Sequence, residues 1–105
     1  MQKEVKLTLT GATVTAYLCA EIDHHAARAI REEIDTALAL QRPESLVLDF
    51  SGVKFMDSSG IALIIGRAES CAKINATVRI SGISAQLMRL LRLSGIEKIN
   101  NVYVE

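Results

Sequence analysis

Apolar residues in this chain change their spacing from one segment to the next, and this alternation constrains the fold more than any other feature. Short apolar runs typical of strands occur at 45–50 and 77–81, and each precedes a longer segment whose apolar residues recur every three or four positions. Strands that run in parallel need crossover connections, which helices usually supply. The pattern therefore predicts an α/β fold with a mixed, mostly parallel β-sheet packed by three to four helices.

The predicted elements begin with a β-hairpin. Strand-like runs at 5–9 and 13–19 flank Thr10-Gly11-Ala12, which suits a turn, so we expect this hairpin to add antiparallel edge strands. Asp23 suits the N-cap of a first helix, and Pro43 ends that helix. The remaining predicted elements are a strand at 45–50, a helix at 59–73, a strand at 77–81, a helix at 84–93 capped by Ser84, and a strand at about 99–104.

Length and composition limit the classes of function. A chain of 105 residues predicts a single domain spanning 1–105. Twelve basic and twelve acidic residues give no net charge, so we expect neither nucleic acid nor a membrane surface as a partner. The sequence shows no secretion signal and no long apolar run, and Cys19 and Cys71 lack metal-ligand spacing. These features predict a cytoplasmic protein with reduced thiols.

The segment Phe55-Met56-Asp57-Ser58-Ser59-Gly60 lies between a predicted strand and a predicted helix. Ser58 or Ser59 therefore falls at a helix N-terminus, where unpaired amides and the helix dipole favour an anion such as a phosphoryl group. Serine is also a common helix cap, aspartate suits the dipole, and glycine lets two backbones approach closely. Spacing alone leaves a phosphorylation site and a simple cap as open alternatives.

The sequence offers little support for catalysis or metal binding. The two histidines, His24 and His25, are adjacent, and neighbouring helical residues point about 100° apart. At most one of them could act as a base for Ser58, and the pair could not ligate one metal ion together. Neither a nucleophile elbow nor a glycine-rich phosphate loop is present. We predict no enzyme activity, and a small serine hydrolase is the alternative that measured turnover would support.

Several motifs together resemble the STAS-domain anti-sigma factor antagonists, most closely the sporulation-type antagonists of anti-sigma F factor. The likeness spans nearly the whole chain. The hexapeptide from Phe55 to Gly60 and the Asp23-His24-His25 start of the first helix are its most specific parts. The further markers are Val47-Leu48-Asp49-Phe50, Ile64-Ile65-Gly66-Arg67 and Leu90-Leu91-Arg92-Leu93-Ser94-Gly95-Ile96.

The resemblance implies a switch between partners. The unphosphorylated antagonist would bind an ATP- or ADP-bound anti-sigma factor serine kinase and release its sigma factor. The kinase would then phosphorylate the first serine of Asp-Ser-Ser-Gly, here Ser58, with Ser59 as the less favoured acceptor. A PP2C-type phosphatase would reverse the modification. The antagonist itself would catalyse nothing and carry no cofactor.

The predicted partner-binding surface surrounds the acceptor serine. Small residues there would let another chain approach closely, although Asp23 could equally be a helix cap and Ala62 an ordinary helical residue. The predicted contacts are Asp23, Asp57, Ser58, Ser59, Gly60, Ala62 and Gly66. After Gly66-Arg67 the family often continues with an aromatic and basic residues, whereas this chain has Ala68-Glu69-Ser70-Cys71. The alternative is therefore a STAS partner-switch protein of another pathway, such as general stress or a signalling complex, with different partners.

Overall fold

The computed structural model describes residues 4–19 and 21–105, which form one five-stranded sheet and three α-helices. The strand order is β1-β2-β3-β4-β5, with β1 antiparallel to β2 and the other neighbours parallel. The strands are β1 (Val5–Thr10), β2 (Thr13–Leu18), β3 (Ser45–Asp49), β4 (Thr77–Ser81) and β5 (Val102–Val104), and the helices are α1 (His24–Gln41), α2 (Ser58–Ala72) and α3 (Ala85–Ser94). The predicted α/β fold with a mostly parallel sheet is confirmed.

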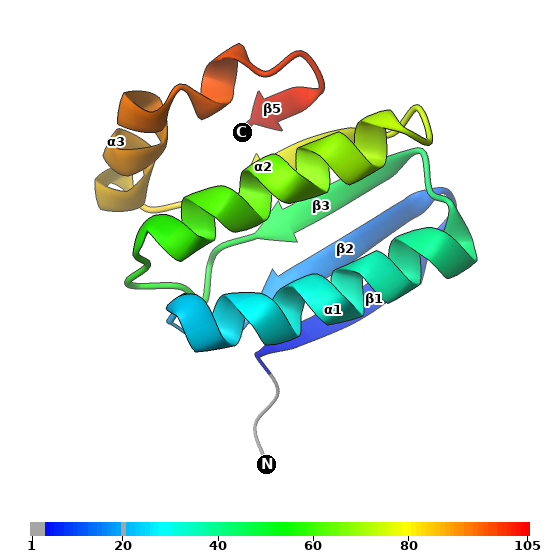
Figure 1. Cartoon of the computed structure of the whole chain (residues 1–105), viewed down its shortest axis with the longest axis horizontal. Helices are drawn as coiled ribbons and strands as arrows, with labels where there is room; N and C mark the ends of the chain where they lie inside the picture. The colour runs from blue at the N-terminus through cyan, green and yellow to red at the C-terminus, as the bar shows by residue number, and fades with distance from the viewer. Residues whose placement is uncertain (1–3, 20) are drawn as a thin grey trace.

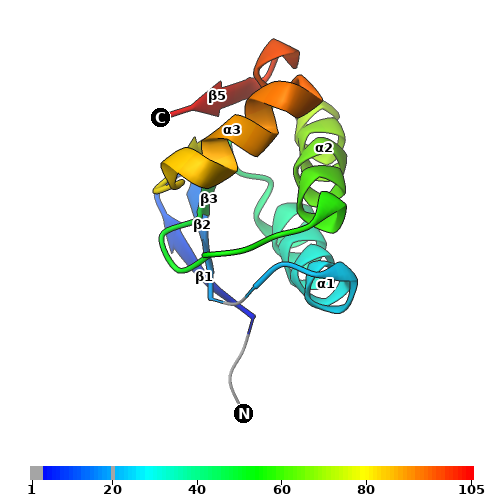
Figure 2. The same ribbon diagram turned by 90° about the vertical axis from the view of Figure 1, so that its left-hand side faces the viewer.

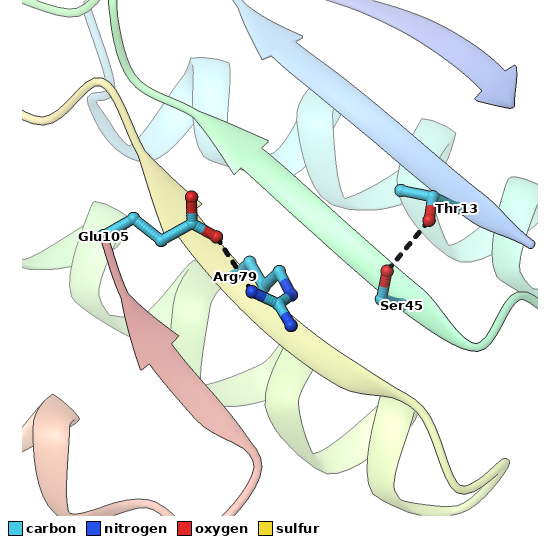
Figure 3. Close-up of polar contacts among 4 residues, drawn as sticks. All are labelled: Thr13, Ser45, Arg79 and Glu105. Atoms are coloured by element: carbon cyan, nitrogen blue, oxygen red, sulfur yellow. Dashed lines mark hydrogen bonds and ion pairs between the residues drawn. The ribbon is translucent and has the colours of Figure 1, made fainter.

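The helices α1 and α2 lie side by side on one face of the sheet, and α3 lies towards its β5 side (Figures 1 and 2). Every second strand residue points into the core beneath α1 and α2, as the alternating burial of β2, β3 and β4 shows. On the opposite face, hydroxyls of Thr13 and Ser45 lie 3.1 Å apart, and Arg79 Nη1 lies 3.2 Å from Glu105 Oε1 (Figure 3). These four polar residues lie on the face of the sheet that no helix covers (Figure 3).

The hairpin differs from the sequence prediction in one respect. The strand β1 is an antiparallel edge strand as expected, with Val5 opposite Leu18. The strand β2 is not an edge strand, because its other side pairs in parallel with β3, and Val14 lies opposite Leu46. Both residues are buried, so the apolar content of β2 reflects its position inside the sheet.

The first helix starts and stops where its local chemistry predicts. The Asp23 side chain accepts a hydrogen bond of 2.8 Å from the Ala26 amide, which confirms it as the N-cap. At the other end Arg42 adopts a left-handed conformation with φ of 42°, immediately before Pro43. A residue that precedes proline disfavours the helical conformation, so the helix cannot continue.

The C-terminal strand is shorter than predicted. Residues 96–98 form a single 3-10 turn after Gly95, whose φ of 79° ends α3. Ile96 is fully buried, and the Ile99 amide donates to its carbonyl at 3.1 Å. A turn therefore buries Ile96 and leaves Ile99 half-buried, and strand pairing begins only at Val102.

Candidate partner-binding site

A short backbone bridge brings the first turns of α1 and α2 together. The Ile22 amide donates to the Phe55 carbonyl and the Asp57 amide donates to the Ile22 carbonyl, each at 3.0 Å. These bonds form an isolated parallel bridge between Ile22 and Met56, both of which are buried. Each helix begins within two residues of this bridge, so both start at the same end of the molecule (Figure 1).

The cap of α2 is an aspartate. The Asp57 side chain accepts a hydrogen bond of 2.7 Å from the Ser59 amide, and α2 begins at Ser58. The alternative in which a serine caps this helix is therefore wrong, because the carboxylate already occupies the position of the cap. Within the described part of the chain, neither Ser58 nor Ser59 uses its hydroxyl in a hydrogen bond.

The two serines differ in exposure. Ser58 is exposed, whereas Ser59 is half-buried and faces the space between α1 and α2. A kinase needs access to the hydroxyl that it modifies, and Ser58 offers that access in the folded protein. Exposure therefore separates two residues that are equivalent in the sequence motif.

Gly60 serves the interior of the protein. It is buried, and a Cβ atom placed on it would lie 2.6 Å from Met56 Sδ and 3.2 Å from Met56 Cβ. Met56 is itself only 4% exposed, so its side chain has little room to move. This contact explains the absence of a side chain at Gly60, and a direct partner contact at Gly60 stays a prediction.

Gly66 and Ala62 lie on the outer part of α2. Ala62 is exposed, Gly66 is half-buried, and a Cβ atom on Gly66 would meet nothing within 4 Å. Asp23 is exposed at the start of α1, even though its carboxylate caps that helix. Asp23, Asp57, Ser58 and Ser59 thus lie where the two helices begin, whereas Ala62 and Gly66 follow along α2 on the side that faces α1.

Phe55 is a surface residue that was not expected from the sequence. Its side chain is 56% exposed, although it directly precedes the buried Met56. A large exposed aromatic ring beside a candidate contact surface is a common anchor at protein interfaces. The position of Phe55 just before a predicted helix start was the feature of the sequence that could have indicated its exposure.

Sequence analysis also missed a buried ion pair between the two helices. Arg67 on α2 is 6% exposed, and its Nε lies 2.9 Å from Asp35 Oδ1 on α1. The angle is not that of a hydrogen bond, and Nη1 is buried without a partner. Burial lowers the pKa of Arg67, with the Asp35 carboxylate opposing this effect and Arg31 adding to it. The spacing of Arg67 from Leu63 and Ile64, both buried, was the signal that its side chain points inwards.

An open groove separates the outer surfaces of α1 and α2 and has a volume of about 420 Å³. Its lining includes His24, Arg28 and Arg31 from α1, and Ser59 and Arg67 from α2. The groove therefore runs from one of the two serines to the buried guanidinium. Within residues 4–19 and 21–105, no three metal-ligating side chains converge on one point, and no helix is both long and apolar enough to cross a bilayer.

Residues 4–105 match the family model of the STAS domain. The chain belongs to the STAS domain family. An anti-sigma F factor antagonist of Paenibacillus polymyxa is 28% identical over 103 residues, which cover 98% of this chain and 88% of the relative. An anti-sigma-B factor antagonist of Listeria monocytogenes is 27% identical over 88 residues, which cover 82% of this chain and 75% of the relative.

Two solved structures of STAS proteins match nearly the whole chain. The unphosphorylated form of the anti-sigma factor antagonist SpoIIAA superposes with a TM-score of 0.82 at 26% identity, covering 96% of this chain and 87% of SpoIIAA. The phosphorylated form of SpoIIAA from Bacillus superposes with a TM-score of 0.74 at 27% identity, covering 96% of this chain and 90% of SpoIIAA. The sheet and helices described above are therefore those of this family.

Proposed function

We propose that this protein is an anti-sigma factor antagonist that binds an anti-sigma factor kinase and is switched off by phosphorylation of Ser58. The observation that carries the proposal is an exposed hydroxyl at the first position of α2 that the described fold does not use. Relatives of similar sequence are antagonists of anti-sigma factors, and a protein of the same fold is known in phosphorylated and unphosphorylated forms. A PP2C-type phosphatase would return the protein to its binding form.

The local electrostatics explain how one phosphate could prevent binding. A phosphoserine adds about −1.5 to −2 charges at neutral pH. At Ser58 this charge would stand next to the Asp57 carboxylate that caps α2. In the free protein both groups are exposed and hydrated. In a complex that covers this surface both would lose water, so phosphorylation would destabilise the complex more than the free protein.

The same surface supplies the remaining contacts of the proposed complex. Phe55 would provide an aromatic anchor beside Ser58, and Ala62 would let the kinase approach α2 closely. Asp23 and Ser59 flank the acceptor at the start of each helix. The protein would bind and be modified without performing any reaction itself, so no cofactor takes part.

Phosphorylation with the anti-sigma kinase encoded beside this gene tests the proposal. The kinase and ATP should add one phosphate to Ser58, located by mass spectrometry of the digested protein. Ser58→Ala should bind the kinase as the wild type does and resist inactivation, because an exposed serine contributes little to stability. Ser58→Asp should bind at least about tenfold more weakly, since it places a charge beside Asp57.

Ser59→Ala is the matched control, because it removes the neighbouring hydroxyl and leaves Ser58 in place. It should still accept phosphate. Phosphate that persists in Ser58→Ala and disappears in Ser59→Ala would move the switch to the second serine. A protein that neither binds nor accepts phosphate with folded kinase would refute the proposal.

A second candidate function keeps the switch and changes the pathway. The similarity to an anti-sigma-B factor antagonist, at 27% identity over 82% of this chain, favours a general stress role. Of the residues after Arg67, Ala68 and Cys71 are buried and cannot touch a partner, so Glu69, which is exposed, is the one that would bear on partner choice. Parallel titrations with an F-type and a B-type anti-sigma kinase should show which kinase binds more tightly.

A further inference from the structure

The groove between α1 and α2 has the charge of an acceptor for an acidic group. Its lining includes His24, Arg28, Arg31 and Arg67, and no aspartate or glutamate lines it. Arg28 has a loose ion pair of 3.5 Å with Glu32, which lies outside the groove. Arg31 forms no ion pair within the described residues. The lining is therefore positively charged even after the internal ion pairs are counted.

Arg67 gives this groove a fixed and incompletely satisfied cation. The residue lines the groove although it is 94% buried, and Nη1 has no hydrogen-bond partner. Asp35 Oδ1 lies 2.9 Å from Nε, and all three atoms, Oδ1, Nε and Nη1, are buried without a hydrogen bond, so the ion pair leaves the guanidinium incompletely satisfied. A buried cation is stabilised when an anion completes its set of partners. A ligand carboxylate would supply acceptors that the described fold lacks.

Gly66 independently points to an approaching chain. A glycine inside a helix destabilises it relative to alanine, and the fold gives no reason for the glycine because a Cβ atom there would meet nothing. Gly66 lies on the groove one turn after Ala62. These two small residues lie on successive turns and leave the backbone of α2 open to contact from outside. The open space is useful only if something enters it.

We infer that the groove receives an aspartate or glutamate side chain of the anti-sigma kinase, held by Arg31 and Arg67. This inference rests on the proposed function, because it assigns a second anchor to the same complex. A volume of about 420 Å³ exceeds a lone carboxylate and suits an acidic side chain together with its backbone and an apolar neighbour. Ser59 lines the same groove, so the acidic anchor would be continuous with the surface around Ser58.

Charge reversal at Arg31 tests the inference, with the kinase encoded beside this gene as the probe. Arg31 is exposed, so Arg31→Glu should fold normally. We expect it to weaken kinase binding at least about tenfold, because the carboxylate introduced at position 31 would repel the kinase carboxylate in the same groove. Arg89→Glu makes the same charge change on an exposed residue of α3 and should bind as the wild type does.

Rescue identifies the acidic residue of the kinase. Among kinase variants in which one surface aspartate or glutamate is changed to arginine, one should lose binding to the wild type and regain it with Arg31→Glu. Wild-type protein that fails to bind the kinase would refute the proposed function itself. Wild-type protein that binds, with Arg31→Glu binding equally well, would refute only the acidic anchor.

The other occupants of the groove give different results. If millimolar inorganic phosphate shifts the NMR amide signals of the groove and Arg31→Glu binds kinase normally, the groove is a site for free phosphate and the inference is wrong. If the wild type is a dimer in sedimentation and Arg31→Glu is a monomer with normal kinase binding, the occupant is a second copy of this chain. Either result excludes the kinase carboxylate.

Discussion

Asp57, Ser58, Ser59 and Gly60 are consecutive, and each is constrained by a different physical effect. The Asp57 carboxylate caps α2, which leaves the Ser58 hydroxyl exposed and unused. Ser59 turns into the groove, and Gly60 packs on the buried Met56. Because the cap and the packing contact lie on either side of the serines, they fix the backbone there. A change at Asp57 or Gly60 should therefore act on stability, and a change at Ser58 on recognition.

Gly60→Ala should lower the free energy of unfolding by up to about 2 kcal/mol. The new Cβ atom would lie 2.6 Å from Met56 Sδ, and overpacking of this kind typically costs about 1 to 3 kcal/mol. The gain in helix propensity on replacing glycine with alanine, about 1 kcal/mol, offsets part of this cost. Chemical denaturation of the wild type and the variant measures the difference.

A Met56→Ala background serves as the control for Gly60→Ala. Removal of the methionine Sδ and Cγ atoms leaves only the Cβ atom of residue 56, at 3.2 Å, so Gly60→Ala should destabilise this background less than it destabilises the wild type. An equal loss of stability in both backgrounds would show that contact with Met56 is not the reason for the glycine.

At the scale of whole elements, α2 joins several roles along one helix. Its first turn holds the proposed acceptor serine, its middle lines the groove through Ala62 and Gly66, and Arg67 ties it to α1 through Asp35. Leu63 and Ile64 are buried in the core, so one face of the helix is fixed. The outer face is available for binding only because the inner face holds the helix in place.

Gly66→Ala should stabilise the protein and weaken kinase binding. The methyl group meets nothing within 4 Å, so the variant should gain about 0.5 to 1 kcal/mol from helix propensity and melt a few degrees higher. The same methyl group would occupy the space that we assign to the kinase. Calorimetry and a kinase titration of one preparation measure both effects.

Ala62→Gly is the matched control on the same face of the same helix. It should destabilise the protein by a similar amount and weaken kinase binding less than Gly66→Ala does, since it removes a methyl group from the proposed contact surface and creates no clash there. Gly66→Ala with raised stability and unchanged binding would mean that no partner lies against this part of α2.

The sequence predicts the elements of this protein better than it predicts their contacts. Local signals are sufficient for the Asp23 cap and the order of strands and helices, because they depend on neighbouring residues. The bridge between Ile22 and Met56 depends on residues far apart in sequence, so no local pattern indicates it. The ion pair between Asp35 and Arg67 depends in the same way on how two helices pack. The serine motif indicated the candidate site and the family resemblance favoured Ser58, and the fold adds that Ser58 is the more exposed of the two serines.

At the scale of the whole molecule, the layer between α1 and α2 contains charge as well as apolar side chains. Cys71 is fully buried on α2, and burial raises the pKa of its thiol to about 11, with Arg67 opposing the effect and Asp35 adding to it. The thiol therefore stays protonated and unreactive in the folded protein. Unfolding returns it to water, where the ordinary thiol pKa applies, so the protonation of one side chain is coupled to global stability.

The stability of the folded protein should accordingly fall as the pH rises from about 9 to about 11. In this range the unfolded chain loses the Cys71 proton while the folded chain retains it, so the unfolded state binds fewer protons and rising pH favours it. Below pH 9 both states hold the proton and this contribution is constant. The fall should be as much as about 1 kcal/mol per pH unit.

Cys71→Ala removes the titrating group, so it should be less stable at pH 8 because of the lost packing, and it should show a shallower decline at higher pH. Urea denaturation of both proteins at intervals between pH 8 and pH 10.5 measures the two slopes. Parallel slopes would show that the thiol is not what links proton release to unfolding.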